Sequence, residues 1–476
     1  MPARTDSPPP PRSVMETLAQ KYDVTRNGFL PHSAPVKRLS MHYATWELLA
    51  QCLPELLKER CLRGVVDGMK VLSVDNLTSE EEWQRAYVIL TFLAHGYIWG
   101  GEKPSEVCKS LKSDASRVYV NLMQVLPPQI AVPLLQVSEH FDLPPTATYA
   151  GLVLWNFQST STDFSDPDSL KAITTFTGTE DESWFYMVSV ALEAQTAYVI
   201  PIMVQAIEAI ERRDYETMSV GLEEMINCIK EMDALLTRMY EKCEPATFYH
   251  DIRPLLAGSM NMEKAGLPNG VFYDEGDGKG SWRKLMGGSN GQSSTIQFLD
   301  IVLGVVHTGG AENATCPVSG VRGYASTTGC PISASKERRV GYHEQVRAYM
   351  PQGHRNFLKN LSRMGSLQEF AMSDHPGAEH ARLRGLHEEA CRTMGDFRKK
   401  HIQIVTRYII IPKTKQPTDK KVRNLATASS ESSDTSELKG TGGTSLAKFL
   451  AQSRDETYMA GCLTREESRV DPKGKE

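Results

Sequence analysis

The chain has 476 residues, of which 40% are hydrophobic and 23% are charged, and its formal net charge is −5. This composition is that of a globular protein with enough chain for two or three domains with cores. The lack of a basic charge balance argues against nucleic acid as a partner. Nine cysteines without paired zinc-ligand spacing indicate free thiols in a reducing compartment.

The first part of the chain predicts a tail followed by a small domain. Residues 1–29 are expected to be a disordered tail, because the start "MPARTDSPPPPRS" is Pro-rich. This start has no apolar core of the kind that a secretory signal needs, so we expect no such signal. Residues 30–175 mix short helical patterns with Pro breaks and are expected to form the smaller, N-terminal domain. Thr78 and Glu81 have the spacing of a capping box ahead of an apolar helix that reaches Trp99.

The following part, residues 176–413, predicts a large helical domain, the place for any buried cofactor. Residues 181–214 read as one long buried helix that Pro201 kinks. Two further helices show apolar stripes at steps of three or four, the second ending at Pro412. The stripes are Met218, Leu222, Met225, Ile229, Met232, Leu236 and Met239, and Leu383, Leu386, Ala390, Met394, Phe397, His401, Ile404 and Tyr408.

Three segments lack this periodicity. Residues 309–336 are rich in Gly, Ser and Thr and are expected to be a mobile insertion. Its Cys316-Pro and Cys330-Pro dipeptides are either loop residues or secondary haem contacts. Residues 414–463 predict a mobile loop and a C-terminal helix, followed by a tail at 464–476. No run reaches about 18 uninterrupted apolar residues, so we expect no membrane span and a cytoplasmic protein.

The stretch "MGGSNGQSST" predicts a glycine-rich turn ahead of a helix that starts near Ser293. Backbone N–H groups at such a junction can bind an anion. Gln292 stands where a nucleotide-binding loop needs lysine, and "KGSWRK" before the turn is a poor strand for a dinucleotide fingerprint. Two interpretations remain: a loop that only leads into a helix, or a loop over a pocket in which Ser289 and its amides hold a carboxylate.

Two further patterns allow both a structural and a functional interpretation. Arg253 follows Phe248 by five residues, so it is either an exposed helix-end arginine or a group that pins a carboxylate beside an aromatic ring. Phe185 and Ser189 lie four residues apart on one helical face. The Ser189 hydroxyl either bonds back to its own helix or points into a pocket.

The twelve histidines include no HExxH motif and no pair with zinc-site spacing. His401 lies on the apolar stripe of the last long helix, which is typical of a core histidine. His354 follows a Pro-Gln-Gly turn in "YMPQGHRNFLKNL", directly at a predicted helix start. It is either a buried structural histidine or the single protein ligand that a five-coordinate haem needs.

Four stretches together resemble the indoleamine 2,3-dioxygenase family in its fungal form: "MPQGHRNFL", "HIQIVTRYIIIP", "GGSNGQSS" and "GTGGTSLAKFL". They occur in the family's order, and the resemblance covers residues 30 to 463. It implies a mostly α fold, in which a large all-helical haem domain joins a smaller N-terminal α/β domain. It also implies haem b as the cofactor, with O2 as co-substrate.

The resemblance also implies roles for individual residues. His354 would be the proximal iron ligand, Phe185 and Ser189 would line the catalytic distal side, and Gly288 and Ser289 would border the haem. The substrate would contact Tyr149, Leu152, Val153, Phe248, Arg253, Ser289 and the loop residue Thr441. Asn290 and Pro254 depart from the family's usual pattern at the pocket edge.

The activity that the resemblance implies is cleavage of the indole C2–C3 bond of L-tryptophan to give N-formylkynurenine, the first step of the kynurenine pathway towards NAD. The expected partners are L-tryptophan, O2 and an external reductant for the iron, and the expected state is a monomer. Two alternatives remain open at this point. One is a family member that acts on a different indole, and the other is a non-enzymatic haem-binding or haem-sensing protein.

Overall fold

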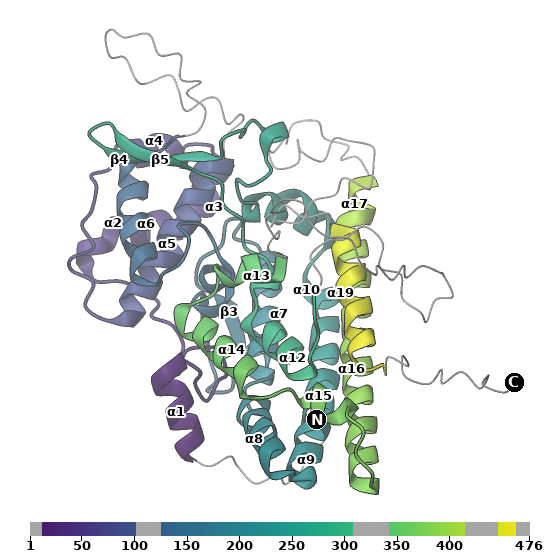
Figure 1. The fold of residues 1–476 in the computed structure, drawn as a ribbon. Coiled ribbons are helices and arrows are strands. Elements are labelled where there is room, and N and C mark those ends of the chain that lie inside the picture. Colours follow the sequence, from purple (N-terminus) through teal and green to yellow (C-terminus); the bar gives the residue numbers. More distant parts are fainter. Residues whose placement is uncertain (1–11, 101–124, 308–341, 415–445, 463–476) are drawn as a thin grey trace, which may run out of the picture.

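The computed structural model describes residues 12–100, 125–307, 342–414 and 446–462. These residues are mostly helical with few strands, which confirms the predicted mostly α fold. Figure 1 shows a smaller group of elements, α2 to α6 with the β4–β5 hairpin, beside a larger set of long helices. Buried apolar side chains form one continuous core through both parts.

The small part is built around α5, Glu80–Trp99, which is buried along most of its length. Its N-cap is Ser79, whose hydroxyl accepts a hydrogen bond from the Glu82 backbone N–H at 3.3 Å, so the predicted capping pair is displaced by one residue. The other helices of this part are α2 (Ala44–Gln51), α3 (Leu53–Lys58), α4 (Leu62–Asp67) and α6 (Pro128–His140), with a 3-10 turn at Met41–Tyr43.

A three-stranded sheet covers this part, with β1 (Val125–Leu126) parallel to β4 (Val271–Gly276) and β4 antiparallel to β5 (Lys279–Arg283). The stretch "KGSWRK", residues 279–284, was expected to be a poor strand, and that expectation was wrong. Asp277 and Gly278 have φ of 52° and 74°, so their Asp-Gly turn closes the hairpin that supplies the pairing partner. Elsewhere β2 (Phe157–Ser159) pairs with β3 (Leu170–Ala172).

The large part begins with α7 (Glu180–Gln195) and α8 (Val199–Arg212). The prediction of a single helix kinked at Pro201 was wrong, since the chain breaks at residues 196–198. Pro201 is the third residue of α8, where the first turn leaves backbone N–H groups without intrahelical partners anyway. Glu180–Arg212 is apolar and long enough to cross a membrane, but 72% of its most apolar window is buried in the core.

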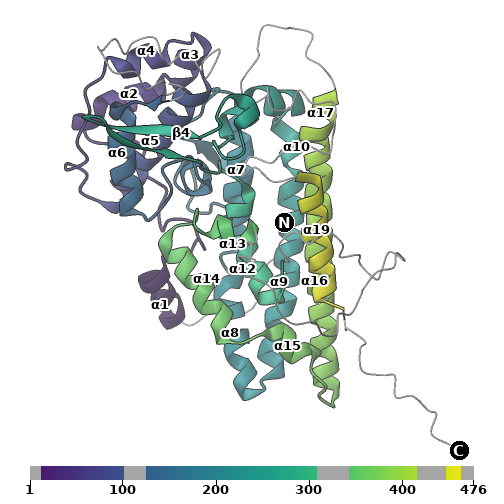
Figure 2. The same cartoon turned by 45° about the horizontal axis from the view of Figure 1, so that its top comes forward.

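Three long helices complete this part. The predicted stripe of α9 (Tyr215–Thr237) is confirmed, because every member from Met218 to Met239 is buried. The helix α16 (Ala378–Val405) runs on through a π-helical turn at Thr406–Ile410 into α17 (Ile411–Thr414). Pro412 therefore does not end it. Figures 1 and 2 show α19 (Leu446–Ala460) lying along α16.

The remaining helices of the large part are short. The helix α12 (Ser294–Leu303) begins near Ser293, as predicted, and the Ser293 hydroxyl caps it. It is followed by α13 (Tyr342–Arg347), α14 (Gln352–Met364) and α15 (Leu367–Met372). The other turns are α10 (Met239–Lys242), α11 (Pro245–Thr247), η3 (Ala150–Leu154), η4 (Pro167–Ser169), η5 (Phe248–Ile252), η6 (Arg253–Leu256), η7 (Glu263–Ala265) and η8 (Asn290–Gln292).

The prediction of a disordered tail over residues 1–29 was wrong for its second half. The helix α1 (Arg12–Tyr22) packs on α14, and Leu18, Val24 and Phe29 are buried. Burial of these apolar side chains offsets the entropy lost when the segment becomes ordered. The Pro-rich start has no such side chains to bury. The predicted insertion at 309–336, with Cys316 and Cys330, and the tail at 464–476 lie outside the described residues.

A buried ion pair joins α2 to α5 in the small part. The Arg85 guanidinium donates to both carboxylate oxygens of Glu47, at 3.1 and 2.8 Å, and to the Thr174 hydroxyl at 2.7 Å. The side chains of Arg85 and Glu47 are only 3% and 6% exposed. Removing one partner would therefore leave a buried charge without compensation.

We expect Arg85→Ala to lower the free energy of unfolding by about 3–5 kcal/mol. Lys230→Ala is the matched control, because Lys230 pairs with Glu389 where the side chains are 57% and 39% exposed. It should cost at most about 1 kcal/mol. Urea denaturation followed by circular dichroism measures both. Equal effects in the two variants would contradict the assigned role of the buried pair.

Candidate active site

The large part encloses a cavity of about 250 Å³. Its walls come from α7, α9, α16 and α19, from the π-helical turns η3 and η5, and from the glycine-rich turn at residues 287–293, here called the Gly-Ser loop. Apolar side chains predominate among them: Leu152, Val153, Phe185, Leu192, Met232, Leu236, Met239, Phe248, Leu256, Ile296, Met394, Phe397, Ile404, Val405, Tyr408, Ile409, Leu446, Phe449 and Leu450. A concave apolar site with a few polar groups is typical of small-molecule binding.

The helix α7 brings Phe185 and Ser189 to this cavity, as their spacing predicted. The Ser189 hydroxyl donates to the Phe185 carbonyl at 3.3 Å, so both earlier interpretations of this serine hold at once. The Phe185 ring lies 4.9 Å from the ring of Phe248, which comes from η5. These two rings form an aromatic wall from segments about sixty residues apart in the chain.

Tyr149, Leu152 and Val153 form the neighbouring wall. The Tyr149 hydroxyl donates to the Glu193 carboxylate at 3.0 Å. The Tyr149 backbone N–H donates to the Gln292 side chain at 2.9 Å, which ties this wall to the Gly-Ser loop. Burial and the nearby Glu193 charge raise the pKa of Tyr149 well above its ordinary value, so the phenol stays protonated.

Arg253 also lines the cavity, so it is not an exposed helix-end arginine. Its guanidinium lies 5.7 Å from the ring of Tyr249. Burial lowers the pKa of Arg253, but a guanidinium starts so high that it remains charged at neutral pH. The cavity therefore contains a half-buried cation suited to a carboxylate.

The Gly-Ser loop borders the cavity through Gly288, Ser289, Asn290 and Gly291. Ser289 caps the short turn η8, where its hydroxyl accepts from the Gly291 N–H at 3.2 Å and from the Tyr342 hydroxyl at 3.4 Å. The structure thus favours the interpretation of a loop over a pocket.

The structure places His354 elsewhere, among protein side chains. His354 is the third residue of α14 and is 4% exposed. Its Nδ1 lies 3.0 Å from the Ser294 hydroxyl, and its ring packs 4.9 Å from the ring of Phe29. It is not among the cavity-lining residues of the described chain. Burial lowers the pKa of His354 to about 3, which is typical of a neutral core histidine.

His401 instead lines the cavity, from the same face of α16 as Met394, Phe397 and Ile404. Its imidazole makes no hydrogen bond to any residue that the structure describes. Burial and the positive charge of Arg398 lower the pKa of His401 to about 4, so at neutral pH both forms of the neutral ring expose a nitrogen lone pair. The sequence contained one signal for this residue, a histidine that interrupts an apolar stripe.

Arg398 accompanies His401 at the cavity wall, three residues earlier on α16. One guanidinium nitrogen donates to Asp300 at 2.5 Å. Its Nε is buried and has no hydrogen-bond partner among the described residues. A buried N–H without an acceptor is costly, so the site favours an acidic group at this position. Thr441, the remaining predicted contact, lies outside the described residues.

The fold and the cavity together define a helical protein with an enclosed, apolar ligand site that contains a cation and a histidine. The chain belongs to the indoleamine 2,3-dioxygenase family, whose model matches residues 18–460, and it is therefore an oxidoreductase of the dioxygenase class that acts on tryptophan or another indole. This result confirms the resemblance inferred from the four sequence stretches.

Three relatives illustrate the match. The chain is 36% identical to indoleamine 2,3-dioxygenase of Saccharomyces cerevisiae, with 94% of this chain and 95% of that protein covered. It is 34% identical to indoleamine 2,3-dioxygenase nanC of Aspergillus nanangensis, with 94% and 98% covered. It is 32% identical to 6-hydroxytryptophan 2,3-dioxygenase fscD of Fusarium equiseti, with 92% and 97% covered.

Close packing of the Gly-Ser loop makes Gly288 a sensitive position. A Cβ at Gly288 would lie 2.3 Å from Leu152 Cδ1 and 3.0 Å from the Ala147 carbonyl oxygen. Gly288→Ala should therefore lower the free energy of unfolding by about 1–3 kcal/mol. In Gly385→Ala, the control, the new Cβ meets no atom within 4 Å, and the helix should gain up to about 1 kcal/mol. Denaturant titration distinguishes the two signs.

Proposed function

We propose that this protein is a haem-dependent dioxygenase that cleaves the indole C2–C3 bond of L-tryptophan with O2 and yields N-formylkynurenine. This is the first step of the kynurenine pathway towards NAD. The observation that carries the proposal is the unbonded His401 imidazole in a cavity that also contains Arg253 and the aromatic wall. A non-enzymatic haem carrier would have no need of the carboxylate-binding cation.

The residues present fit haem b. A flat apolar macrocycle suits walls such as Phe397, Ile404 and Leu236, and a neutral imidazole suits its iron. The unpaired Nε of Arg398 suits a haem carboxylate. Ferrous haem, when bound, supplies the site at which O2 is activated, which is chemistry that no side chain provides.

We propose His401 as the iron ligand in place of His354. A ligand must present a free nitrogen to the cavity, and His401 does so. His354 is not among the cavity-lining residues of the described chain, and its ring is packed on Phe29. In this proposal His354 is a structural residue that joins α14 to α12.

The remaining residues bind and orient the substrate. Arg253 pairs with the tryptophan carboxylate, which fixes one end of the molecule. Phe248, Tyr149, Leu152 and Val153 hold the indole ring by apolar contact. Phe185 and Ser189 border the distal side, where they exclude water and limit the space for O2. Gly288 and Ser289 border both ligands.

The substrate specificity that we propose favours L-tryptophan over a ring-hydroxylated indole. The wall formed by Tyr149, Leu152 and Val153 presents hydrocarbon, because the Tyr149 hydroxyl already donates to Glu193. A buried hydroxyl without a partner there would cost about 1–3 kcal/mol. The Fusarium relative is named for 6-hydroxytryptophan, so that compound is the informative competitor. We further propose a cytoplasmic monomer that receives electrons from an external reductant.

The two histidines can be distinguished by their effect on haem. His401→Ala should abolish the native spectrum of the ferrous CO complex, because the ring is the proposed ligand. His354→Gln should retain that spectrum, since the glutamine amide can still bond to Ser294 while it supplies no iron ligand. Absorbance of the reduced proteins under CO tests both, with circular dichroism as the check of folding. Loss of the native spectrum in His354→Gln alone would overturn the assignment.

The role of Arg253 can be tested by turnover. Arg253→Ala should raise KM for L-tryptophan by about tenfold or more, because one charge-assisted contact is worth about 1.5–3 kcal/mol. The haem spectrum should be unchanged. Arg382→Ala is the control, since this exposed arginine pairs with Glu216 and Glu223 far from the cavity lining. N-formylkynurenine is followed by its near-ultraviolet absorption. Wild-type turnover by Arg253→Ala would refute the assigned contact.

A further inference from the structure

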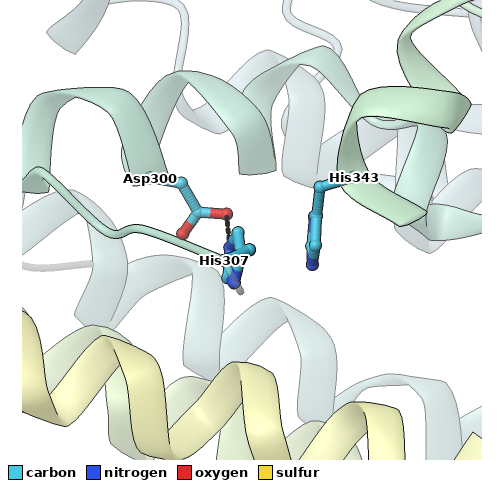
Figure 3. Close-up of side chains that lie close together, drawn as sticks. All are labelled: Asp300, His307 and His343. Carbon is cyan, nitrogen blue, oxygen red and sulfur yellow. Dashed lines mark hydrogen bonds and ion pairs between the residues drawn. The ribbon is translucent and has the colours of Figure 1, made fainter. Parts of the chain in front are cut away.

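A second cluster of ligating side chains lies at the edge of the cavity, next to the residues proposed to hold haem. It consists of Asp300 on α12, His307 in the segment after α12, and His343 on α13. One donor atom from each residue lies within 4.8 Å of the others. Figure 3 shows the Asp300 carboxylate bonded to the His307 ring, with the His343 ring beside them and parallel to the His307 ring. The ring centroids are 3.6 Å apart.

The geometry points to a binding site for a divalent transition-metal ion of the zinc type, with Asp300, His307 and His343 as the protein ligands. Two imidazoles and a carboxylate are a donor set that zinc prefers, and water completes such a site. Asp300 Oδ2 and His307 Nε2 lie 3.0 Å apart, close to the separation of two donors on one ion. The assignment does not rest on the proposed dioxygenase activity.

Two neighbouring groups orient these donors. His307 Nδ1 lies 2.7 Å from a carboxylate oxygen of Glu456 on α19. Metal-binding histidines almost always bond in this way, with one ring nitrogen to a carboxylate or carbonyl group and the other to the metal ion. Arg398 donates to the other oxygen of Asp300 at 2.5 Å, which leaves Oδ2 directed at His307. Both donors are therefore held by partners on other elements.

His343 is the residue that an ion-pair network alone does not explain. The pairs of His307 with Asp300 and Glu456 are complete without it. Its hydrogen bond to the Ser453 hydroxyl is long, at 3.3 Å. Its ring stacks on that of His307 at an interplanar angle of 10°, so metal binding requires the His343 ring to turn about its side-chain bonds until both imidazoles direct a lone pair at one ion.

Metal binding would join three elements at the edge of the cavity. His343 and Arg398 line the cavity themselves, and Phe449 on α19 packs 5.2 Å from the His343 ring. The ion would be held by residues of α12, of the segment after it and of α13. Because Glu456 of α19 bonds to His307, the ion would also hold α19 against the cavity wall. A structural metal stabilises the folded state by its binding free energy, because the unfolded chain has no preformed site.

The test uses the full-length, haem-loaded protein after a chelator has removed any loosely bound divalent ions. Isothermal titration calorimetry with zinc chloride measures binding, and thermal unfolding is compared with and without zinc. Wild type should bind a single zinc ion per chain at this site and unfold at a higher temperature with zinc. His343→Gln should lose at least tenfold in affinity while the ion pairs of His307 remain. Glu456→Gln should lose about 10–100-fold, as outer partners of metal ligands do.

His32→Gln is the control, since this exposed histidine lies outside the cluster. It should bind zinc as wild type does. Unchanged zinc affinity in both His343→Gln and Glu456→Gln would overturn the assignment and leave only an ion-pair network at this position. Absence of saturable zinc binding in wild type would overturn it as well. Neither result bears on haem binding or tryptophan turnover, so the dioxygenase proposal is judged separately.

Discussion

The cavity depends on one buried carboxylate, that of Glu193. It accepts hydrogen bonds from the hydroxyls of Tyr149, Ser293 and Thr295, at 3.0, 2.5 and 2.6 Å. Burial raises the pKa of Glu193, and these three hydroxyl donors counter that effect. Because a buried carboxylate is costly unless its oxygens are bonded, the segments that carry the donors cannot separate without a large penalty. Glu193 thereby holds α7, the segment before η3 and the start of α12 together.

The same network decides which atoms face the cavity. Several polar groups in and next to its walls are already bonded within the protein: Tyr149 to Glu193, Ser189 to the Phe185 carbonyl, and Gln292 to the Gly287 carbonyl and the Tyr149 N–H. The lining is mostly apolar, and its polar groups include the guanidinium groups of Arg253 and Arg398, the His401 ring and the Glu193 carboxyl group. A molecule with an apolar ring and one carboxylate matches this distribution, and a uniformly polar one does not.

Local spacing was enough for the features that depend on a single helix. The stripe of α9, the Ser293 helix start and the common face of Phe185 and Ser189 all follow from a period of 3.6 residues. The roles of the histidines could not be predicted in this way, because a histidine on an apolar stripe gives the same sequence pattern whether its ring packs in a core or lines a cavity. Only packing distinguishes them: Ser294, sixty residues away, satisfies His354, while the meeting of α7, α9, α16 and α19 leaves space at His401.

Long-range pairing explains the other errors. The β5 strand contains little that favours a strand, and it forms because the Asp277–Gly278 turn folds it back on β4. The helix α1 follows a Pro-rich start and is ordered by α14, more than three hundred residues further on. Neither partner is visible within a local window of sequence, so pattern reasoning placed both segments outside regular structure.

The cavity also depends on a backbone irregularity that no periodic pattern predicts. The π-helical turns among the described residues, Ala150–Leu154, Phe248–Ile252 and Thr406–Ile410, each contribute side chains to its lining. Each is closed by a hydrogen bond that spans five residues, as from the Trp155 N–H to the Ala150 carbonyl at 3.0 Å. The additional residue widens the turn and rotates the following side chains around the helix axis. With regular α-helical spacing, the side chains of Leu152, Phe248 or Tyr408 would point in a different direction and would no longer line the cavity. The cavity therefore forms where the helices depart from the period of 3.6 residues, and that period is the signal from which the regular helices were predicted.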